Sequence, residues 1–453
     1  MIEDSGWVLV PALVTVITAI FSRRPIASLL AGTLMGLLML DPGAALNNFS
    51  ATLLAVMMDE TIAWVIIVCG LMGSLISLLM RAGAVDTFSM ALATKAKGRR
   101  SALLYTWLLG IFVFIDDYLN ALAVGSSMRK VTDRFRVSRE MLAYVVDSTA
   151  APICVLVPVS TWAVFYASLF VDAGFAAPGQ GMGLYISAIP YMVYPLVAVL
   201  LVPLVAWGFL PVLGQMKVAE TRAAGLVAPT NAVDLAAETE NASLPHPQAT
   251  LKLYHFLLPL GTLIGVTLWY DLDVQIGVIV AVAATLVLFG SQKVMSWGDM
   301  FDAVLEGLKM MLPALTIVVM AFTFKAVNDQ LGLPTFVIDR VAPLMTPLLF
   351  PVMTFLTMAI VSFATGSSWG VFAIAIPIIL PLAESVGVSL PLAIGALLSA
   401  SAFGSHACFY SDATVLAAEG SGCDVIDHAL SQFPYALVAA LLSCVLLTLL
   451  AAI

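Results

Sequence analysis

Apolar stretches of membrane-spanning length recur along the whole chain, and this feature limits the possible fold more than any other. Of the 453 residues, 61% are apolar and 10% are charged, whereas about a quarter of the residues in a soluble globular protein carry charge. A bilayer core of about 30 Å is crossed by roughly 20 helical residues, so the chain has room for about ten spans. The apolar stretches are 7–21, 26–40, 62–80, 140–171, 183–210, 255–270, 275–290, 311–328, 389–417 and 433–453. The sequence therefore predicts an all-α polytopic membrane protein.

Charge and cysteine content exclude several other classes of protein. The chain has 19 Lys and Arg residues against 28 Asp and Glu residues, a net charge of −9, which is the wrong balance for a nucleic-acid-binding chain. Its five cysteines are scattered without paired spacing, so neither a disulfide framework nor a zinc site is expected. We expect no cofactor. The first residues are acidic where a secretory signal would be basic, so we expect the first apolar stretch to be a retained helix.

Two further apolar stretches, 101–128 and 347–381, are predicted to form re-entrant hairpins. Cationic clusters flank the first on both sides, within 95–100 and 129–139. Because the cytoplasmic side of a membrane protein carries the Lys and Arg excess, both ends of this stretch belong on that side. The tip of the hairpin then lies at Asp116-Asp117-Tyr118.

The distribution of charge along the chain predicts its orientation. With the N-terminus outside, every Lys and Arg falls on the cytoplasmic side except Arg340, which falls outside, and Lys325, which falls within a span. We therefore expect a multi-pass protein of the cytoplasmic (inner) membrane of a prokaryote, with a cytoplasmic central linker. The predicted exterior loops carry acids instead: Asp41, Asp59, Glu60, Asp172, Asp271, Asp273 and Glu384.

The chain repeats its pattern of stretches after about 249 residues. This predicts a first repeat at 1–211, a linker at 212–252 and a second repeat at 253–453. Each repeat would hold five transmembrane helices, one of them broken (140–171 and 389–417), plus one hairpin. Since five is odd, the second repeat must be inverted in the membrane, which is the plan of many secondary transporters.

Four polar segments interrupt the apolar helices, and these are the predicted functional site. Unpaired backbone at membrane depth is tolerated where it lines a cavity or binds a ligand. The segments are the two hairpin tips and the two helix breaks, near 147–152 and 404–414. The candidate ion- or substrate-binding residues are Asp116, Asp117, Asn120, Asp147, Ser148, Thr149, Thr365, Gly366, Ser367, Ser368, Trp369, His406, Ser411 and Asp412; of these, Asp116, Asp117, Asp147 and Ser148 are the candidate Na+ ligands.

Each acidic candidate also has a structural interpretation. Desolvation and mutual repulsion would favour a proton on Asp116 or Asp117 near neutral pH, but Asp116 could instead cap the second hairpin arm while Asp117 faces water. Asp147 could ligate a cation or cap a half-helix. His406 and Asp412 could relay a proton, or His406 could be an ordinary hydrogen-bonding residue.

Lys325 is the one cation predicted within a span. It could be the charge partner of an intramembrane acid, or it could extend to the outer interface.

The polar segments resemble the signature stretches of a known family. Phe-Ile-Asp-Asp-Tyr at 114–118, Met-Arg-Lys-Val-Thr-Asp at 128–133, Asp-Ser-Thr-Ala-Ala-Pro at 147–152 and Thr-Gly-Ser-Ser-Trp-Gly at 365–370 are similar to those of NhaC-type sodium/proton antiporters, within the ion-transporter superfamily. The resemblance implies an inverted-repeat fold, a dimer and an elevator-like motion. The family also includes sodium-linked exchangers of organic acids and carriers of amino acids. One departure is Ser405, where family members commonly carry an acid.

The leading functional hypothesis is sodium-coupled secondary transport by Na+/H+ antiport. Na+ would bind between the first hairpin tip and the break at Ser148 and displace a proton from Asp116 or Asp117. The alternative is a Na+-coupled symporter or exchanger of a small organic anion or amino acid, and a passive channel is a remote third. We do not expect an enzyme, since Ser405, His406 and Asp412 match a triad in residue type only. No phosphate-binding Gly-rich loop supports ATP-driven pumping.

Overall fold

The computed structural model describes residues 6–22, 24–225, 251–333, 336, 345–365, 369–409 and 411–453, and every regular element in these ranges is helical. Thr365, Trp369 and Asp412 are described by their backbone alone. The helices are η1 (Gly6–Leu9), α1 (Val10–Ser22), α2 (Pro25–Leu40), α3 (Ala45–Met57), α4 (Glu60–Arg81), α5 (Ala84–Ala93), α6 (Arg99–Phe112), α7 (Asp117–Arg134), α8 (Arg139–Thr149), α9 (Ala151–Leu156), α10 (Thr161–Asp172), α11 (Gly181–Ala188), η2 (Ile189–Tyr191), α12 (Val193–Trp207), α13 (Gly214–Ala223), α15 (Tyr254–Trp269), α16 (Val274–Ser291), α17 (Trp297–Gln330), α19 (Phe350–Thr365), α20 (Trp369–Val386), α21 (Leu390–Ala407), α22 (Asp412–Ser421) and α23 (Val425–Ala451).

Six of the described helices are long and apolar enough to cross a bilayer, and α11–η2 with α12, bent by 54°, would make a seventh. Six shorter apolar helices accompany them. The prediction of an all-helical membrane protein is confirmed. The division into repeats at 1–211 and 253–453 stays a prediction.

Some helices differ in extent from the hydropathy prediction. Helix α17 begins at Trp297, well before the predicted start at 311, because the Ser296 side chain caps it by accepting from Asp299 N. Helices α3 and α5 were not expected. Hydropathy marks the apolar part of a helix, whereas caps and backbone hydrogen bonds decide where the helix begins.

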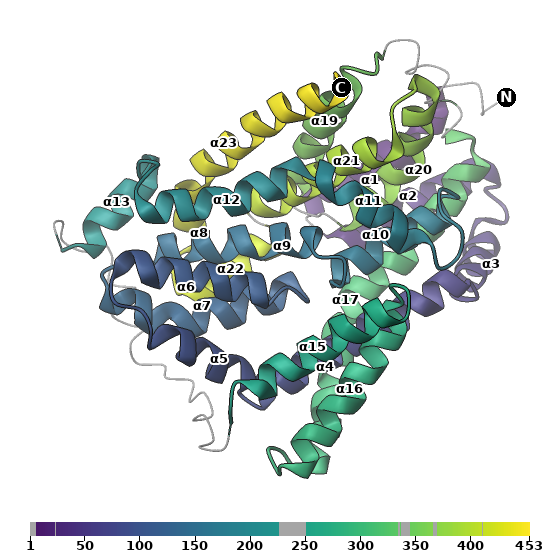
Figure 1. The fold of residues 1–453 in the computed structure, drawn as a ribbon. Helices are drawn as coiled ribbons and strands as arrows, with labels where there is room; N and C mark the ends of the chain where they lie inside the picture. Colours follow the sequence, from purple (N-terminus) through teal and green to yellow (C-terminus); the bar gives the residue numbers. More distant parts are fainter. Residues whose placement is uncertain are drawn as a thin grey trace.

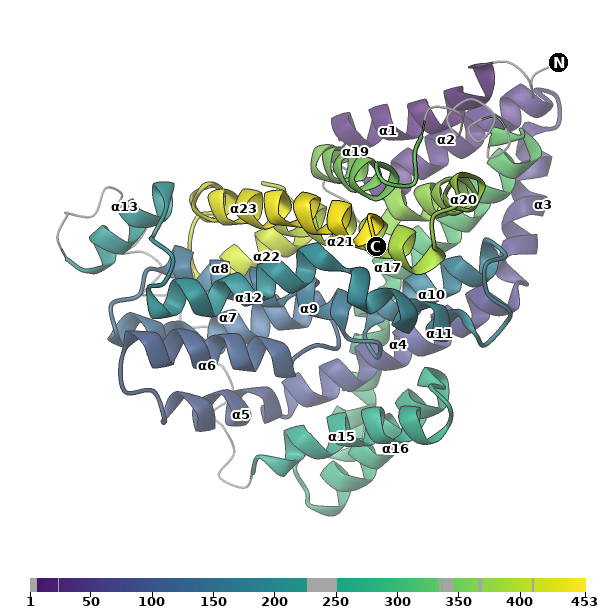
Figure 2. The ribbon, with the colours of Figure 1, turned by 45° about the horizontal axis from the view of Figure 1, so that its top comes forward.

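Two groups of helices pack closely. Helices α6 to α9 pack with α12, α22 and α23, and α4 packs along α17 beside α15 and α16. In both ribbon views α15 and α16 lie below α6 to α9 and α12 (Figures 1 and 2).

A glycine crossing brings α4 and α17 into direct backbone contact. A Cβ added to either Gly73 or Gly307 would overlap the backbone of the other glycine. Beside this crossing, Ser74 Oγ donates to Val304 O at 2.9 Å. Small residues at such crossings let membrane helices approach closely.

The segment predicted as the first hairpin, 101–128, contains two helices, α6 and α7, joined by the short non-helical segment 113–116. The corresponding segment of the second half, predicted at 347–381, contains α19 and α20. Its tip residues 366–368 lie outside the described residues. Helices α6 and α7 lie beside the interrupted helix α8, and α19 and α20 lie beside the interrupted helix α21.

The first broken helix is interrupted twice, whereas the sequence predicted one break near 147–152. Helix α8 ends at Thr149, and α9 follows directly with Pro152 in its first turn, where a proline is compatible with a helix. The second interruption, 157–160, lies between α9 and α10. The second predicted broken helix, 389–417, is interrupted between Ala407 and Asp412, within the break predicted near 404–414.

The interruptions before α10 and α22 each end at a serine that makes the same pair of hydrogen bonds. Ser160 Oγ donates to the carbonyl oxygen of Cys154 and accepts from Ala163 N, so it caps α10. Ser411 Oγ donates to Ser405 O and accepts from Thr414 N, so it caps α22. The donor and its acceptor are six positions apart in both cases.

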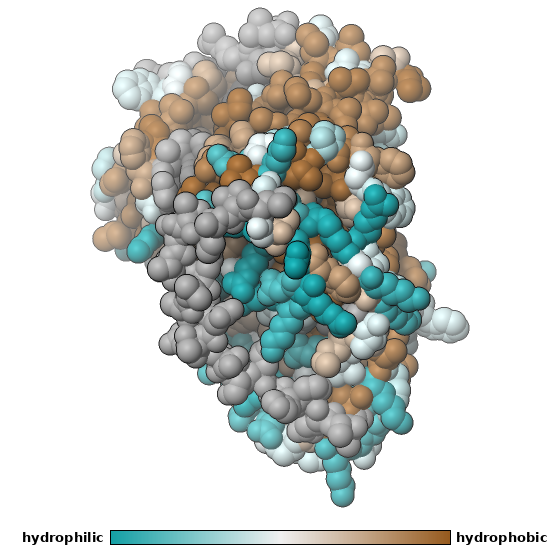
Figure 3. Space-filling model, turned by 90° about the vertical axis from the view of Figure 1, so that its left-hand side faces the viewer, coloured by the Kyte–Doolittle hydropathy of each residue, from teal (hydrophilic) through white to brown (hydrophobic). Residues whose placement is uncertain are grey.

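Hydrophilic side chains gather on the end of the molecule where α13 lies (Figure 3). Exposed cations on the neighbouring ends of α6 and α7 include Arg100, Lys130 and Arg134. Two ion pairs, Arg99 with Glu220 and Arg222 with Glu140, hold α13 to α6 and α8 there. These are cations that the sequence analysis assigned to the cytoplasmic side.

Candidate functional site

The first hairpin tip places two buried carboxylates against the start of α10. Asp116 is 3% exposed and Asp117 is 1% exposed. Asp116 Oδ1 accepts from Tyr118 N and its Oδ2 accepts from Thr161 Oγ1, both at 3.0 Å. Asp117 Oδ1 accepts from Trp162 Nε1 at 3.0 Å. The backbone of Thr161 also donates to Ile115 O, so the tip and the α10 N-terminus form one unit.

Asn120 joins this tip to the first helix break. Its Nδ2 lies within hydrogen-bonding distance of three carbonyl oxygens, those of Gly110 (2.6 Å), Val113 (3.0 Å) and Thr149 (2.8 Å). Gly110 lies in α6, Val113 directly follows α6, and Thr149 ends α8 at the α8–α9 break. The side chain therefore satisfies backbone oxygens that the interruptions leave without helical partners.

Asp147 forms the centre of a second buried cluster. Its Oδ2 lies 2.7 Å from Gln432 Nε2, 3.2 Å from His428 Nε2 and 3.4 Å from Thr414 Oγ1. Its Oδ1 is buried without a hydrogen-bond partner among the described residues. Asp147 comes from α8, Thr414 from α22 and the other two from α23, so both halves of the chain build this cluster.

His406 extends the cluster towards α12. Its Nε2 lies 2.9 Å from Ser148 Oγ, and its Nδ1 lies 2.8 Å from the hydroxyl of Tyr194. The carbonyl oxygen of His406 accepts from Gln432 Nε2. All four side chains are nearly or fully buried. The histidine thus connects α8, α12, α21 and α23.

The described candidates fall into two clusters rather than one. Asp147, Ser148, His406 and Ser411 belong to the central cluster, the last through its contact with Thr414. The other group contains Asp116, Asp117, Asn120 and Thr149, and the Asn120 contact with the Thr149 carbonyl links it to the first. Gly366, Ser367 and Ser368 lie outside the described residues, and for Thr365, Trp369 and Asp412 only the backbone is described.

Two structural interpretations of the acids need correction. Asp116 does cap the second arm through Tyr118 N, but Asp117 is buried and does not face water. Asp147 lies inside α8 and caps no helix. Its carboxylate instead contacts helices from the far end of the chain.

Lys325 Nζ lies 3.3 Å from Asp172 Oδ2 and 3.0 Å from Asp329 Oδ2, and 18% of the Lys325 side chain is exposed. It therefore pairs with acids rather than extending alone to the interface. Asp172 ends α10 and Lys325 lies on α17, so this contact joins α10 to α17.

Sequence reasoning did not predict His428, Gln432, Thr414 or Tyr194 as site residues. A usable signal exists for the first two, because His428, Ser431 and Gln432 are polar at spacings of three and four, which puts them on one face of an apolar helix. Tyr194 offers no such signal.

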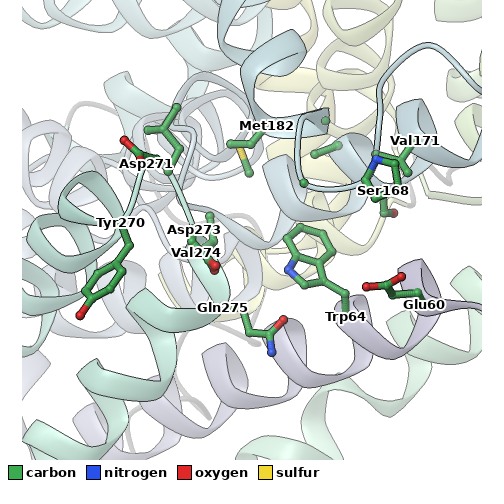
Figure 4. A pocket seen from close by; sticks show the side chains of 15 residues that line it. Glu60, Trp64, Ser168, Val171, Met182, Tyr270, Asp271, Asp273, Val274 and Gln275 are labelled. Atoms are coloured by element: carbon green, nitrogen blue, oxygen red, sulfur yellow. The ribbon is translucent and has the colours of Figure 1, made fainter.

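A cavity of about 470 Å³ lies apart from both clusters. The start of α4, the α10–α11 connection and the α15–α16 turn surround it, and Trp64 lies between Glu60 and the 270–275 segment (Figure 4). It is lined by acids that the sequence analysis assigned to the exterior, including Asp271 and Asp273. Over the described residues, no group of three or more His, Cys, Asp or Glu side chains is arranged to hold a metal ion.

Residues 175–452 match the sequence model of the Na+/H+ antiporter family. The chain belongs to this family. The predicted resemblance is thereby confirmed, and the chain is a membrane transporter rather than an enzyme. Among its relatives, a Haemophilus influenzae protein of uncharacterized function is 29% identical, over 96% of this chain and 88% of its own length.

Two relatives with described activities match over part of their lengths. The malate-2H(+)/Na(+)-lactate antiporter of Bacillus subtilis is 28% identical over 43% of this chain and 42% of its own length. The arginine/ornithine antiporter ArcD of Halobacterium salinarum is 28% identical over 42% of this chain and 40% of its own length.

Solved structures share the fold over nearly the whole chain. The YdaH transporter of Alcanivorax borkumensis superposes with a TM-score of 0.64 at 15% identity, over 89% of this chain and 88% of that one. The MtrF protein of Neisseria gonorrhoeae superposes with a TM-score of 0.58 at 12% identity, over 91% and 85% of the two chains.

Proposed function

We propose that this protein is a Na+/H+ antiporter of the prokaryotic inner membrane. The observation that carries the proposal is Asp147, a fully buried carboxylate with one oxygen saturated by hydrogen-bond donors and the other without a partner among the described residues. A buried charge is costly unless a counter-charge accompanies it, so such a group favours either a proton or a cation. One carboxylate that holds one or the other is the minimum requirement for exchange.

Asp116 and Asp117 supply a second acidic position at the first hairpin tip. Both carboxylates accept from side chains at the start of α10, where the helix dipole also favours negative charge. In this proposal Na+ passes between the hairpin tip and the Asp147 cluster, which Asn120 and the Thr149 carbonyl connect. A proton leaves one of the carboxylates as the ion arrives.

The contacts among helices suggest which parts would move. Helix α7 packs on α8 and α22, and α21 packs on α9 and α19, whereas α4 packs on α17 and α16, and α17 packs on α2. We assign the hairpins and broken helices to a body that shifts against α4 and α17 in an elevator-type cycle. The two-repeat division, which the repeated pattern of apolar stretches predicts, and a homodimer, which the family resemblance implies, belong to the same proposal.

The test is Na+ uptake by proteoliposomes under an imposed pH gradient. Asp116→Asn and Asp117→Asn, alone and together, are compared with the wild type. We expect the double variant to lose pH-driven uptake. Full uptake by a folded double variant would remove the hairpin tip from the mechanism.

Exchange of a small organic solute is the second candidate, because the two relatives with described activities exchange carboxylates or amino acids. Ser405, in place of an acid, and the Tyr166 hydroxyl bonded to Ser401 provide neutral polar groups for such a solute. A thermal-stability screen of amino acids and carboxylates, with and without Na+, separates the candidates. Stabilisation by one solute only in the presence of Na+ would favour this second function.

A further inference from the structure

The central cluster contains a second buried oxygen without a partner, on Gln432. The side-chain amide of Gln432 is 1% exposed, and its Oε1 has no hydrogen-bond partner among the described residues. The Nε2 atom of the same amide lies 2.7 Å from Asp147 Oδ2 and also donates to the His406 carbonyl. A polar oxygen buried in this way is costly unless something occupies its lone pairs.

The orientation of the Gln432 amide is fixed by its neighbours. Both atoms near Nε2, the carboxylate of Asp147 and the carbonyl of His406, can only accept hydrogen bonds in these contacts. Turning the amide over would place Oε1 against two acceptors and lose both bonds. Gln432 Oε1 therefore points away from these two acceptors. The amide that carries this oxygen stays next to the Asp147 carboxylate.

Asp147 Oδ1 also lacks a hydrogen-bond partner among the described residues. Three donors surround Oδ2, whereas none of the described residues reaches Oδ1. The two unpartnered oxygens thus lie on adjacent groups, one on a carboxyl group and the other on a side-chain amide. Oxygen ligands of these two kinds are what a hard cation takes in a protein.

We propose that Gln432 Oε1 and Asp147 Oδ1 are ligands of the transported alkali cation, with His428 as the positioning residue. His428 Nε2 and Gln432 Nε2 hold Oδ2, which keeps Oδ1 available for the ion. This inference rests on the proposed function and extends it, because it adds a ligand from α23 beside the Asp147 carboxylate of α8. The ion would then bridge the first and last parts of the chain.

The test measures Na+ binding by the full-length protein in detergent. The thermal unfolding midpoint is followed as NaCl replaces choline chloride at constant ionic strength, which gives an apparent Kd for Na+. The variants are Asp147→Asn and Gln432→Leu. The matched control is Ser431→Ala, since Ser431 is buried beside Gln432 and its hydroxyl bonds, among the described residues, only to His428 O on its own helix.

We expect the wild type and Ser431→Ala to be stabilised by Na+ with the same apparent Kd. Gln432→Leu should raise this Kd by about tenfold or more, which corresponds to about 1.4 kcal/mol. Asp147→Asn should lose the response. A Gln432→Leu protein with the Kd of the Ser431→Ala control would overturn this inference and leave Na+ coupling intact. A wild type with no Na+ response would instead remove the proposed function.

A second variant keeps the inference testable if Gln432→Leu does not fold. Gln432→Met keeps the length of the side chain and removes the proposed ligand oxygen without placing a new acceptor against Asp147 or His406. We expect this variant to bind Na+ with an apparent Kd about tenfold or more above that of the wild type. Equal binding by the two proteins would contradict the proposed role of Gln432.

Discussion

The side-chain nitrogen of Gln432 lies 2.7 Å from Oδ2 of Asp147, although the two residues are 285 positions apart in the chain. His428, on the same face of α23, reaches the same oxygen. The buried carboxylate, which lies in the first half of the chain, thus depends on the second half for its side-chain hydrogen bonds. A change on α23 will therefore alter the chemistry of α8.

Asn120 should be a strong determinant of stability. Replacing it with Ala removes the donor that serves three buried carbonyl oxygens, and each carbonyl left without a partner costs about 1–3 kcal/mol. We expect the free energy of unfolding, measured by denaturant titration in detergent, to fall by at least about 2 kcal/mol. The control is Asn328→Ala, because the one acceptor that buried Asn328 reaches in the part of the chain that the structure describes is Phe324 O, on its own helix. Equal losses for the two variants would contradict the bridging role of Asn120.

The α4–α17 crossing makes a prediction about two glycines. Gly73→Ala places a methyl group against the backbone of Gly307, so the helices must separate, at a cost of about 1–3 kcal/mol. Gly265→Ala, in α15, adds a methyl group with no described residue within 4 Å and should be neutral or slightly stabilising. Thermal unfolding midpoints of the two variants test this difference. A Gly73→Ala protein as stable as the wild type would show that the helices are farther apart.

Lys325 and Asp172 should be energetically coupled. Both side chains are 18% exposed and their charged groups lie 3.3 Å apart. A double-mutant cycle with Lys325→Met and Asp172→Asn should give a coupling of about 1 kcal/mol, because partial burial limits solvent screening. Lys325→Met alone should also be more destabilising than the double variant, since it leaves two acids without their shared cation. Additive effects would show that the contact contributes nothing.

The predicted orientation can be tested with single cysteines. Lys130→Cys, on the exposed cationic end of α7, should react with an impermeant maleimide only from the cytoplasmic side. Tyr270→Cys, on the exposed α15–α16 turn, should react only from the exterior. Both are made in a background without the five native cysteines. Labelling of Lys130→Cys from outside would reverse the topology.

Hydropathy predicted the helical class because membrane helices need apolar length, but it could not locate every break. The interruption at 157–160 was missed because Val157 and Val159 keep the segment apolar. Pro158 ends α9, because it disfavours the helical conformation at Val157 and has no N–H to donate. The Ser160 cap and the contact of Thr161 with the hairpin tip then fix the start of α10.

The sequence predicted only part of the candidate site. Composition marked Asp147, Ser148 and His406, since polar residues at membrane depth are costly. Their partners His428 and Gln432 lie near the start of a long helix, where polar residues are common, and their contact with Asp147 spans more than half the chain. Such a distant pairing depends on helix packing and is not encoded in any local pattern.

The most direct test of Na+/H+ exchange at Asp147 uses liposomes that contain only the purified protein and a trapped pH-sensitive dye. Na+ added outside should make the lumen more alkaline, without any organic solute. A folded Asp147→Asn protein should give no change, because its neutral side chain cannot exchange a proton for a cation. A silent wild type, or an Asp147→Asn protein that moves protons at the wild-type rate, would contradict the account.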